Sequence, residues 1–108
     1  MAANKLLSML GLAAKAGRIA SGEFQTEEAA GNGKAQLVLV SSDAAAGTVK
    51  KFRDMCAYRE IPFFQTEEDM ESLGRAIGKE CRSSLAVTDC GLAAAVQKLL
   101  PEGNNERK

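Results

Sequence analysis

Four consecutive apolar residues, Leu37–Val40, constrain the fold of this chain more strongly than any other segment. Side chains alternate between the two faces of a strand, so a strand made only of apolar residues must be covered on both sides. The run therefore predicts a central strand with helices packed on each face of its sheet. We expect an α/β protein, a three-layer α/β/α sandwich around a small mixed sheet.

The other expected elements alternate between helix and strand along the chain. Apolar side chains recur at helical spacing in several segments, while short apolar runs are typical of strands. Glycine or proline follows some of these segments at the points where they should end. The pattern predicts helices over residues 3–16, 22–30, 47–59, 66–77 and 89–100, and further strands over residues 18–20, 61–64 and 85–87.

Single residues sharpen three of these boundaries. Pro62 lacks an amide hydrogen, which places its strand at an edge of the sheet or at the very start of the strand. Thr66, with Asp69 three residues later, resembles a capping box that opens a short helix. Asp89 is expected to cap the last helix.

The chain of 108 residues is long enough for one domain and too short for two. We expect the domain to span residues 1–100 and residues 101–108 to form a flexible C-terminal tail, because nothing after the proline is apolar. No apolar run approaches the roughly 20 residues of a membrane span, and the start of the chain lacks the pattern of a secretory signal. We therefore expect a cytoplasmic protein that does not bind membranes.

Few residues in this sequence suit catalysis or metal binding. Histidine is absent, and the three cysteines lack C-x-x-C spacing and are expected to be reduced packing residues. Neither the phosphate-binding loop G-x-x-x-x-G-K-[ST] nor the dinucleotide-binding motif G-x-G-x-x-G occurs. One alternative is an enzyme in which Asp43 and Asp89 face each other at the carboxyl ends of two strands and bind magnesium or share acid and base roles, although helix capping is the favoured role for both. We expect a non-enzymatic protein with no cofactor and no metal.

Residues 15–28 place cationic side chains just before the start of a helix. Lys15 and Arg18 precede a Ser-Gly turn, and polar residues then open the helix. Such a start presents unpaired N–H groups and the positive end of the helix dipole, both of which favour phosphate. Phe24 lies within it, where packing against the first helix is favoured over stacking on a splayed base.

The polar connection of residues 78–84 is a second candidate surface. It carries Lys79 and Arg82 among small residues, which let a nucleic-acid backbone approach closely. A solvated loop without a binding role is the alternative interpretation.

Several short motifs follow one another in a characteristic order. They are Leu10-Gly11-Leu12-Ala13, Lys15-Ala16-Gly17-Arg18, Ser21-Gly22-Glu23, residues 34–40 leading into Asp43, and residues 73–80. With this order and spacing, nearly the whole chain resembles the L-seven-Ae family of ribosomal proteins, which bind kink-turn RNA, and especially its short bacterial YlxQ-like members. The resemblance implies an α/β/α sandwich whose RNA site joins the start of the second helix to the loop before a late strand.

The helix start departs from the family's usual Gly-Thr-Asn-Glu with a lysine further along. Gly22 keeps the glycine, while Glu23 takes the threonine position and Phe24 the asparagine position. Gln25 replaces the glutamate, and Glu28 stands where the lysine would be. Because these exchanges remove groups that read base edges and add repulsion toward phosphate, we expect altered recognition at the helix start.

Together these observations predict non-enzymatic binding of structured RNA by a monomer. Ribosomal RNA is the expected partner, with ribosomal or translation-associated proteins as further ones. The formal net charge is zero, so the affinity must come from a local basic surface. The alternative is a protein-interaction module that uses residues 50–59 or the acidic run 67–71. The expected RNA-binding residues are Lys15, Arg18, Gly22, Glu23, Phe24, Gln25, Lys34, Lys79, Glu80, Arg82 and Ser83.

Overall fold

The computed structural model describes residues 2–100, with side chains from residue 5 onward. The predicted order of helices and strands is confirmed, and most boundaries shift by only one or two residues. The proposed tail, residues 101–108, lies outside the described residues. None of the described helices has the length and apolarity that a membrane span needs. The elements are α1 (Ala2–Lys15), β1 (Ile19–Ser21), α2 (Glu23–Gly31), β2 (Leu37–Val40), α3 (Ala46–Arg59), β3 (Phe63–Gln65), α4 (Met70–Ala76), β4 (Ser84–Val87) and α5 (Cys90–Gln97).

A four-stranded mixed sheet with the order β1-β4-β2-β3 forms the middle layer. β4 runs antiparallel to both β1 and β2, whereas β2 and β3 are parallel. β3 is an edge strand, as Pro62 predicted, and it begins at Phe63, directly after the proline. The Pro62 carbonyl accepts a hydrogen bond from the Val38 amide at 3.0 Å. The proline therefore joins the edge of the sheet through its acceptor alone.

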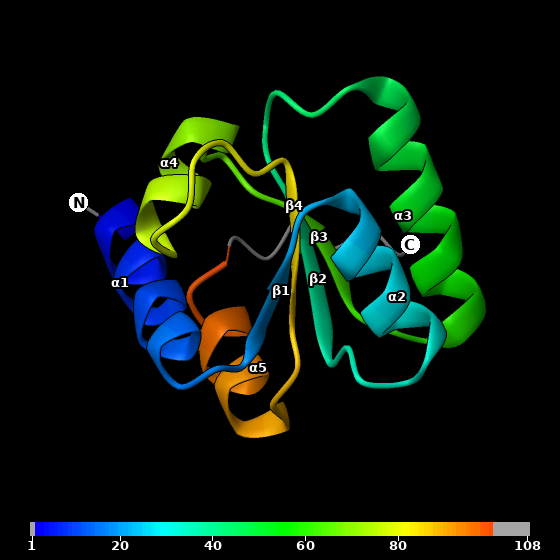
Figure 1. The fold of residues 1–108 in the computed structure, drawn as a ribbon, viewed down its shortest axis with the longest axis horizontal. Helices are drawn as coiled ribbons and strands as arrows, with labels where there is room; N and C mark the ends of the chain where they lie inside the picture. Colours follow the sequence, from blue (N-terminus) through cyan, green and yellow to red (C-terminus); the bar gives the residue numbers. More distant parts are fainter. Residues whose placement is uncertain (1, 101–108) are drawn as a thin grey trace.

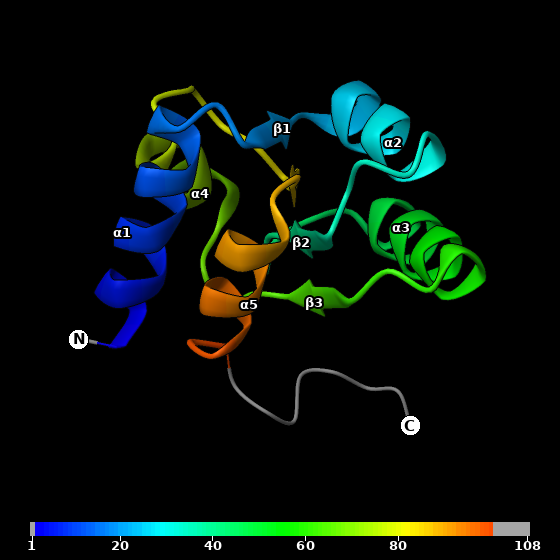
Figure 2. The same cartoon turned by 90° about the horizontal axis from the view of Figure 1, so that it is seen from below.

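Helices cover both faces of the sheet, which confirms the predicted three-layer sandwich. α2 and α3 lie on one face, and α1, α4 and α5 lie on the other (Figure 1 and Figure 2). Leu37 and Leu39 belong to the core beneath α1, α4 and α5, while Val38 and Val40 belong to the core beneath α2 and α3. All four side chains are fully buried, so a polar residue in this run would lose its hydration in either core.

The two last helices begin at aspartates, but only one start matches the prediction. Asp89 caps α5, and its carboxylate accepts a hydrogen bond from the Leu92 amide at 2.9 Å. The predicted capping box at Thr66 is wrong, because Asp69 caps α4 and accepts from the Ser72 amide at 2.8 Å. The buried Thr66 hydroxyl instead donates to the Val40 carbonyl, which fixes it to the end of β2. α5 also ends at Gln97 and not near residue 100.

The expectation that Asp43 and Asp89 face each other is wrong. The strands that they follow, β2 and β4, are antiparallel, so their carboxyl ends lie at opposite ends of the sheet. Asp43 accepts a hydrogen bond from the Met70 amide at 3.0 Å, and Asp89 serves as the α5 cap. Among the residues that the structure describes, no cluster of three or more acidic or cysteine side chains could hold a metal ion.

The three cysteines occupy different environments. Cys56 is buried in the α2/α3 core, and burial raises the pKa of its thiol to about 12. Cys81 and Cys90 are exposed, so the prediction of a packing role is wrong for these two. Cys81 lies in the loop between α4 and β4, and Cys90 is the first residue of α5.

Candidate nucleic-acid interface

Pairing between β1 and β4 brings together the two segments that the sequence singled out. Ser21 lies opposite Leu85 in the register, and the Gly22 amide donates to the Ser84 carbonyl at 3.0 Å. The start of α2 and the α4–β4 loop, residues 77–83, therefore meet at one end of the sheet (Figure 1). Residues about 60 positions apart thereby form one continuous surface.

Arg82 links the α4–β4 loop to the end of β1. Its Nε donates to Ser21 Oγ at 3.2 Å, and its Nη1 donates to the Cys81 carbonyl at 2.9 Å. A Cβ placed on Gly22 would lie 3.9 Å from Nε, and Gly22 itself has a φ of 90°, which disfavours any other residue. Arg82 forms no ion pair with any described side chain, so its positive charge remains available beside the helix start.

The N-terminus of α2 is open. Gly22 is the capping residue and has no side chain to accept from the first amides, and no described side chain caps this helix. Within the described residues, the amides of the first turn therefore have no side-chain cap, and together with the positive end of the helix dipole they suit a phosphate.

The exposure of Phe24 shows that its predicted packing against the first helix is wrong. Its side chain is 75% exposed, because Thr26, Ala29 and Ala30 occupy the buried face of α2 and Phe24 lies on another side of the helix. Gln25 is exposed as well. An aromatic ring and a side-chain amide are therefore both available to a ligand at the open helix end.

Glu23 has a partner that the sequence did not reveal. Lys51, on α3, places its ammonium 3.1 Å from Glu23 Oε2 and 2.7 Å from Glu27 Oε1. The hydrogen bond to Glu27, together with that to Glu23, raises the pKa of Lys51 above its usual value. Nothing local in the sequence predicts a contact over 28 residues, although charge clusters in both helices are a hint.

The α4–β4 loop is folded tightly onto α4. The Arg82 amide donates to the Met70 carbonyl at 2.9 Å, and the Lys79 amide donates to the Gly74 carbonyl at 2.8 Å. Lys79 and Glu80 are exposed, while Ser83 is partly buried and its carbonyl accepts from the Ser41 amide. The loop therefore presents its charged side chains from a backbone fixed at both ends.

Three expected site residues lie away from this surface. Arg18 and Lys15 precede β1, at the opposite end of that strand from Gly22, and the Arg18 carbonyl accepts from the amide of Thr88, the residue after β4. Lys34 follows α2, two residues before Gln36, whose amide donates to the last carbonyl of β4. All three cations are exposed and none forms an ion pair within residues 5–100.

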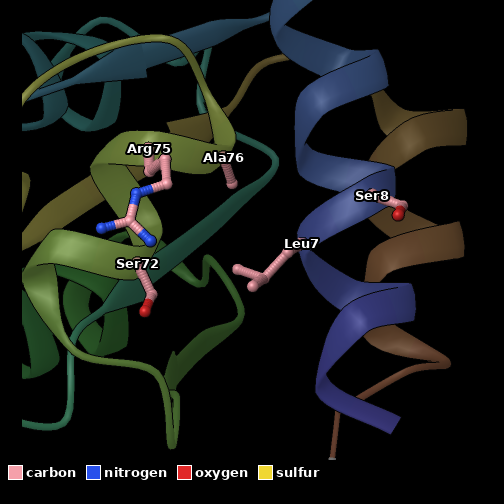
Figure 3. Close-up of a pocket in the computed structure, with 5 residues that line it drawn as sticks. All are labelled: Leu7, Ser8, Ser72, Arg75 and Ala76. Atoms are coloured by element: carbon pink, nitrogen blue, oxygen red, sulfur yellow. The ribbon is translucent and has the colours of Figure 1, made fainter. Parts of the chain in front are cut away.

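A groove of about 290 Å³ lies between α1 and α4, on the face of the sheet opposite α2 and α3 (Figure 1). Leu7, Ser8, Ser72, Arg75 and Ala76 line it (Figure 3). Arg75 pairs with Glu71 on the same helix at 2.8 Å. The groove shares no residue with the surface at the start of α2.

Two bacterial proteins are similar to this chain over most of its length. RNA-binding protein YlxQ of Bacillus subtilis (strain 168) is 42% identical over 92 residues, covering 85% of this chain and 91% of that protein. RNA-binding protein YlxQ of Enterococcus faecium is 34% identical over 96 residues, covering 89% and 91%.

Two solved structures share the fold. One, described as a protein with unknown function from Bacillus halodurans, has a TM-score of 0.84 and 42% identity, covering 88% of this chain and 95% of that one. The Giardia lamblia 15.5kD RNA binding protein has a TM-score of 0.76 at 20% identity, covering 92% and 90%. A model of the ribosomal protein L7Ae/L30e/S12e/Gadd45 family matches residues 4–97. The chain therefore belongs to the ribosomal protein L7Ae/L30e/S12e/Gadd45 family.

Proposed function

We propose that this chain is a non-enzymatic RNA-binding protein that holds structured RNA at the start of α2 and the adjoining α4–β4 loop. One observation carries the proposal: an exposed Phe24 stands at an open helix N-terminus, beside the unpaired charge of Arg82. The names of the two relatives at 42% and 34% identity support RNA as the ligand.

Each group at this surface has a task that its chemistry suits. The first amides of α2 and the Arg82 guanidinium hold one phosphate from two sides. The Phe24 ring stacks on a base, and the Gln25 amide offers both a donor and an acceptor to a base edge. Lys79 contacts the backbone from the loop, beside Ser83 and Glu80.

This division of tasks selects a class of RNA. A phenyl ring has no hydrogen-bonding group, so it gains affinity only from a base that has left its own stack. The ligand is therefore folded RNA with a splayed nucleotide, as in a bulge or a kink-turn, and ribosomal RNA is its proposed source. Lys15, Arg18 and Lys34, at the other end of β1, contact phosphates of the continuing helix.

The remaining features of the proposal concern the domain, its location and its partners. The RNA-binding domain spans residues 1–100 and acts as a monomer in the cytoplasm, with translation-associated proteins as further partners. Zero net charge removes long-range attraction, so affinity depends on these few local contacts.

A filter-binding titration with two RNA probes tests the proposal. The first is a kink-turn hairpin, in which a bulge precedes tandem G·A pairs, and the second is a fully paired duplex of equal length. Wild-type protein is expected to prefer the hairpin. Phe24→Ala should lose roughly 5- to 100-fold in affinity for it, the range of one lost base stack. Arg82→Ala should also reduce the slope of log K against log salt by about one.

The chain supplies matched controls for both variants. Tyr58 is an aromatic residue 83% exposed on α3, and Arg75 is an exposed arginine on the groove side. Tyr58→Ala and Arg75→Ala should leave hairpin affinity unchanged. Equal binding of hairpin and duplex, or equal losses in the control variants, would overturn the proposed surface. Partners that survive nuclease treatment, with no hairpin binding, would favour the protein-interaction module.

A further inference from the structure

Three glutamates on α2 place negative charge beside the proposed RNA-binding surface, where it opposes the binding of phosphate. Glu23, Glu27 and Glu28 lie within six residues of one another, and only the first two have an ion-pair partner among the described residues. That partner is Lys51, which comes from a different helix and contacts both carboxylates.

The geometry of α2 turns the Glu23 and Glu27 carboxylates away from Gln25. Glu23 and Glu27 are four residues apart, so they lie on the same side of the helix, toward α3. Gln25 is two residues from either and points to the opposite side. In Figure 1, α2 begins between the α4–β4 loop on one side and α3 on the other. The contacts with Lys51 hold both carboxylates on the α3 side of α2.

We propose that Lys51 is a positioning residue for RNA binding: it holds the Glu23 and Glu27 carboxylates on the α3 side of α2 and partly neutralises them. This inference rests on the proposed function, because it concerns the same helix start. It assigns to Lys51 no contact with the RNA.

The reason is competition for the open helix end. Glu23 is the first residue of α2, where a carboxylate is attracted by the same amides and dipole that would hold a phosphate. A Glu23 side chain released from Lys51 can turn toward those amides and occupy them. It would also repel an approaching phosphate within the roughly 8 Å over which physiological salt leaves charges unscreened.

A double-mutant cycle tests this role with the kink-turn hairpin as the probe. The proteins are wild type, Lys51→Gln, the pair Glu23→Gln with Glu27→Gln, and the combination of all three changes. Lys51→Gln alone should weaken hairpin binding about 3- to 10-fold, the scale of one or two unscreened surface charges. With both glutamates changed, the same lysine substitution should change affinity less than about 2-fold, because its partners are gone.

The neighbouring lysine is the matched control. Lys50 pairs with Asp54 on its own helix at 2.7 Å and does not reach α2, so Lys50→Gln should leave affinity unchanged. Salt dependence in the background without the two glutamates separates positioning from direct contact: with Glu23 and Glu27 both changed to Gln, Lys51→Gln should leave the slope of log K against log salt unchanged, because the carboxylates that it positions are gone. A direct phosphate contact would instead lower that slope by about one.

The outcomes are distinguishable. No hairpin binding by wild-type protein overturns the proposed function itself. Wild-type binding with no effect of Lys51→Gln overturns only the role of Lys51. An equal loss in both backgrounds, with a reduced salt slope, shows that Lys51 touches phosphate and also overturns the positioning role. Recovery of affinity in the triple variant supports it.

Discussion

Gly74 packs in α4 directly against the backbone of the α4–β4 loop. A Cβ added there would lie 1.3 Å from the Glu80 carbonyl oxygen, whereas side-chain carbons essentially never approach closer than 3.0 Å. Gly74→Ala therefore requires the Glu80 carbonyl to move by roughly 2 Å. The loop is held against α4 on both sides of Glu80, because the Lys79 and Arg82 amides donate hydrogen bonds to carbonyls of α4. These bonds oppose the movement of the Glu80 carbonyl.

Two opposing terms set the size of this effect. Alanine is favoured over glycine within a helix by about 1 kcal/mol. Overpacking of a well-packed site costs about 1–3 kcal/mol, and more where the obstacle is backbone that cannot change rotamer. We expect the cost of the clash to exceed the gain in helix propensity, so that Gly74→Ala destabilises the protein by about 2 kcal/mol. This lowers Tm by roughly 10 °C in a domain of this size.

Thermal and urea denaturation followed by circular dichroism measure this change, and Gly47→Ala is the control. Gly47 lies in α3, and a methyl group added there would meet no other atom within 4 Å, so alanine should stabilise by about 0.5–1 kcal/mol. Below its melting temperature, Gly74→Ala should also bind the hairpin more weakly, because the displaced loop carries Arg82. Equal stabilisation by both substitutions would refute the close packing at Gly74.

Two further predictions concern the cysteines and the cap of α4. A thiol reagent at pH 8 should modify Cys81 and Cys90 in native protein and Cys56 only after unfolding, because burial raises the pKa of the Cys56 thiol to about 12; equal rates at all three, measured by mass spectrometry, would contradict this. The hydrogen bond from the Ser72 amide lowers the pKa of the Asp69 carboxyl, so its contribution to stability is present above about pH 4 and lost as the pH falls further. Asp69→Ala should therefore destabilise at pH 7 and lose that effect in acid, and a pH-independent difference in unfolding free energy would count against the cap.

Local patterns in the sequence were sufficient for much of the fold. The all-apolar Leu37–Val40 run predicted a strand with two covered faces, and Pro62 predicted an edge strand. Asp89 predicted the start of α5. In each case the residues that carry the pattern, or their immediate neighbours, are also the ones whose structure it determines.

Such local patterns do not predict the direction of a strand or contacts between residues far apart in the sequence. The Asp43–Asp89 hypothesis failed because nothing local records that β4 runs antiparallel to β2. Gly74 looks like a weak point within a helix until the Glu80 carbonyl is seen beside it. The pairing of Lys51 with Glu23 likewise depends on how α2 and α3 pack.

Tertiary context also decides what one short sequence becomes. The pentapeptide Phe-Gln-Thr-Glu-Glu occurs at residues 24–28, where it forms most of α2, and again at residues 64–68, where its first residues end β3. Phe24 is exposed in the first copy, and Phe64 is buried in the core in the second. The sequence alone proposed residues for the candidate site, while their exposure and partners required the structure.

The position of the RNA is tested most directly by mapping amide chemical shifts of the protein by NMR as the kink-turn hairpin is added. We expect the largest changes to fall on residues 22–25 and 78–84, with smaller ones at Lys15, Arg18 and Lys34. Changes concentrated on the α1/α4 groove, or none at a saturating concentration of the hairpin, would contradict the proposed interface.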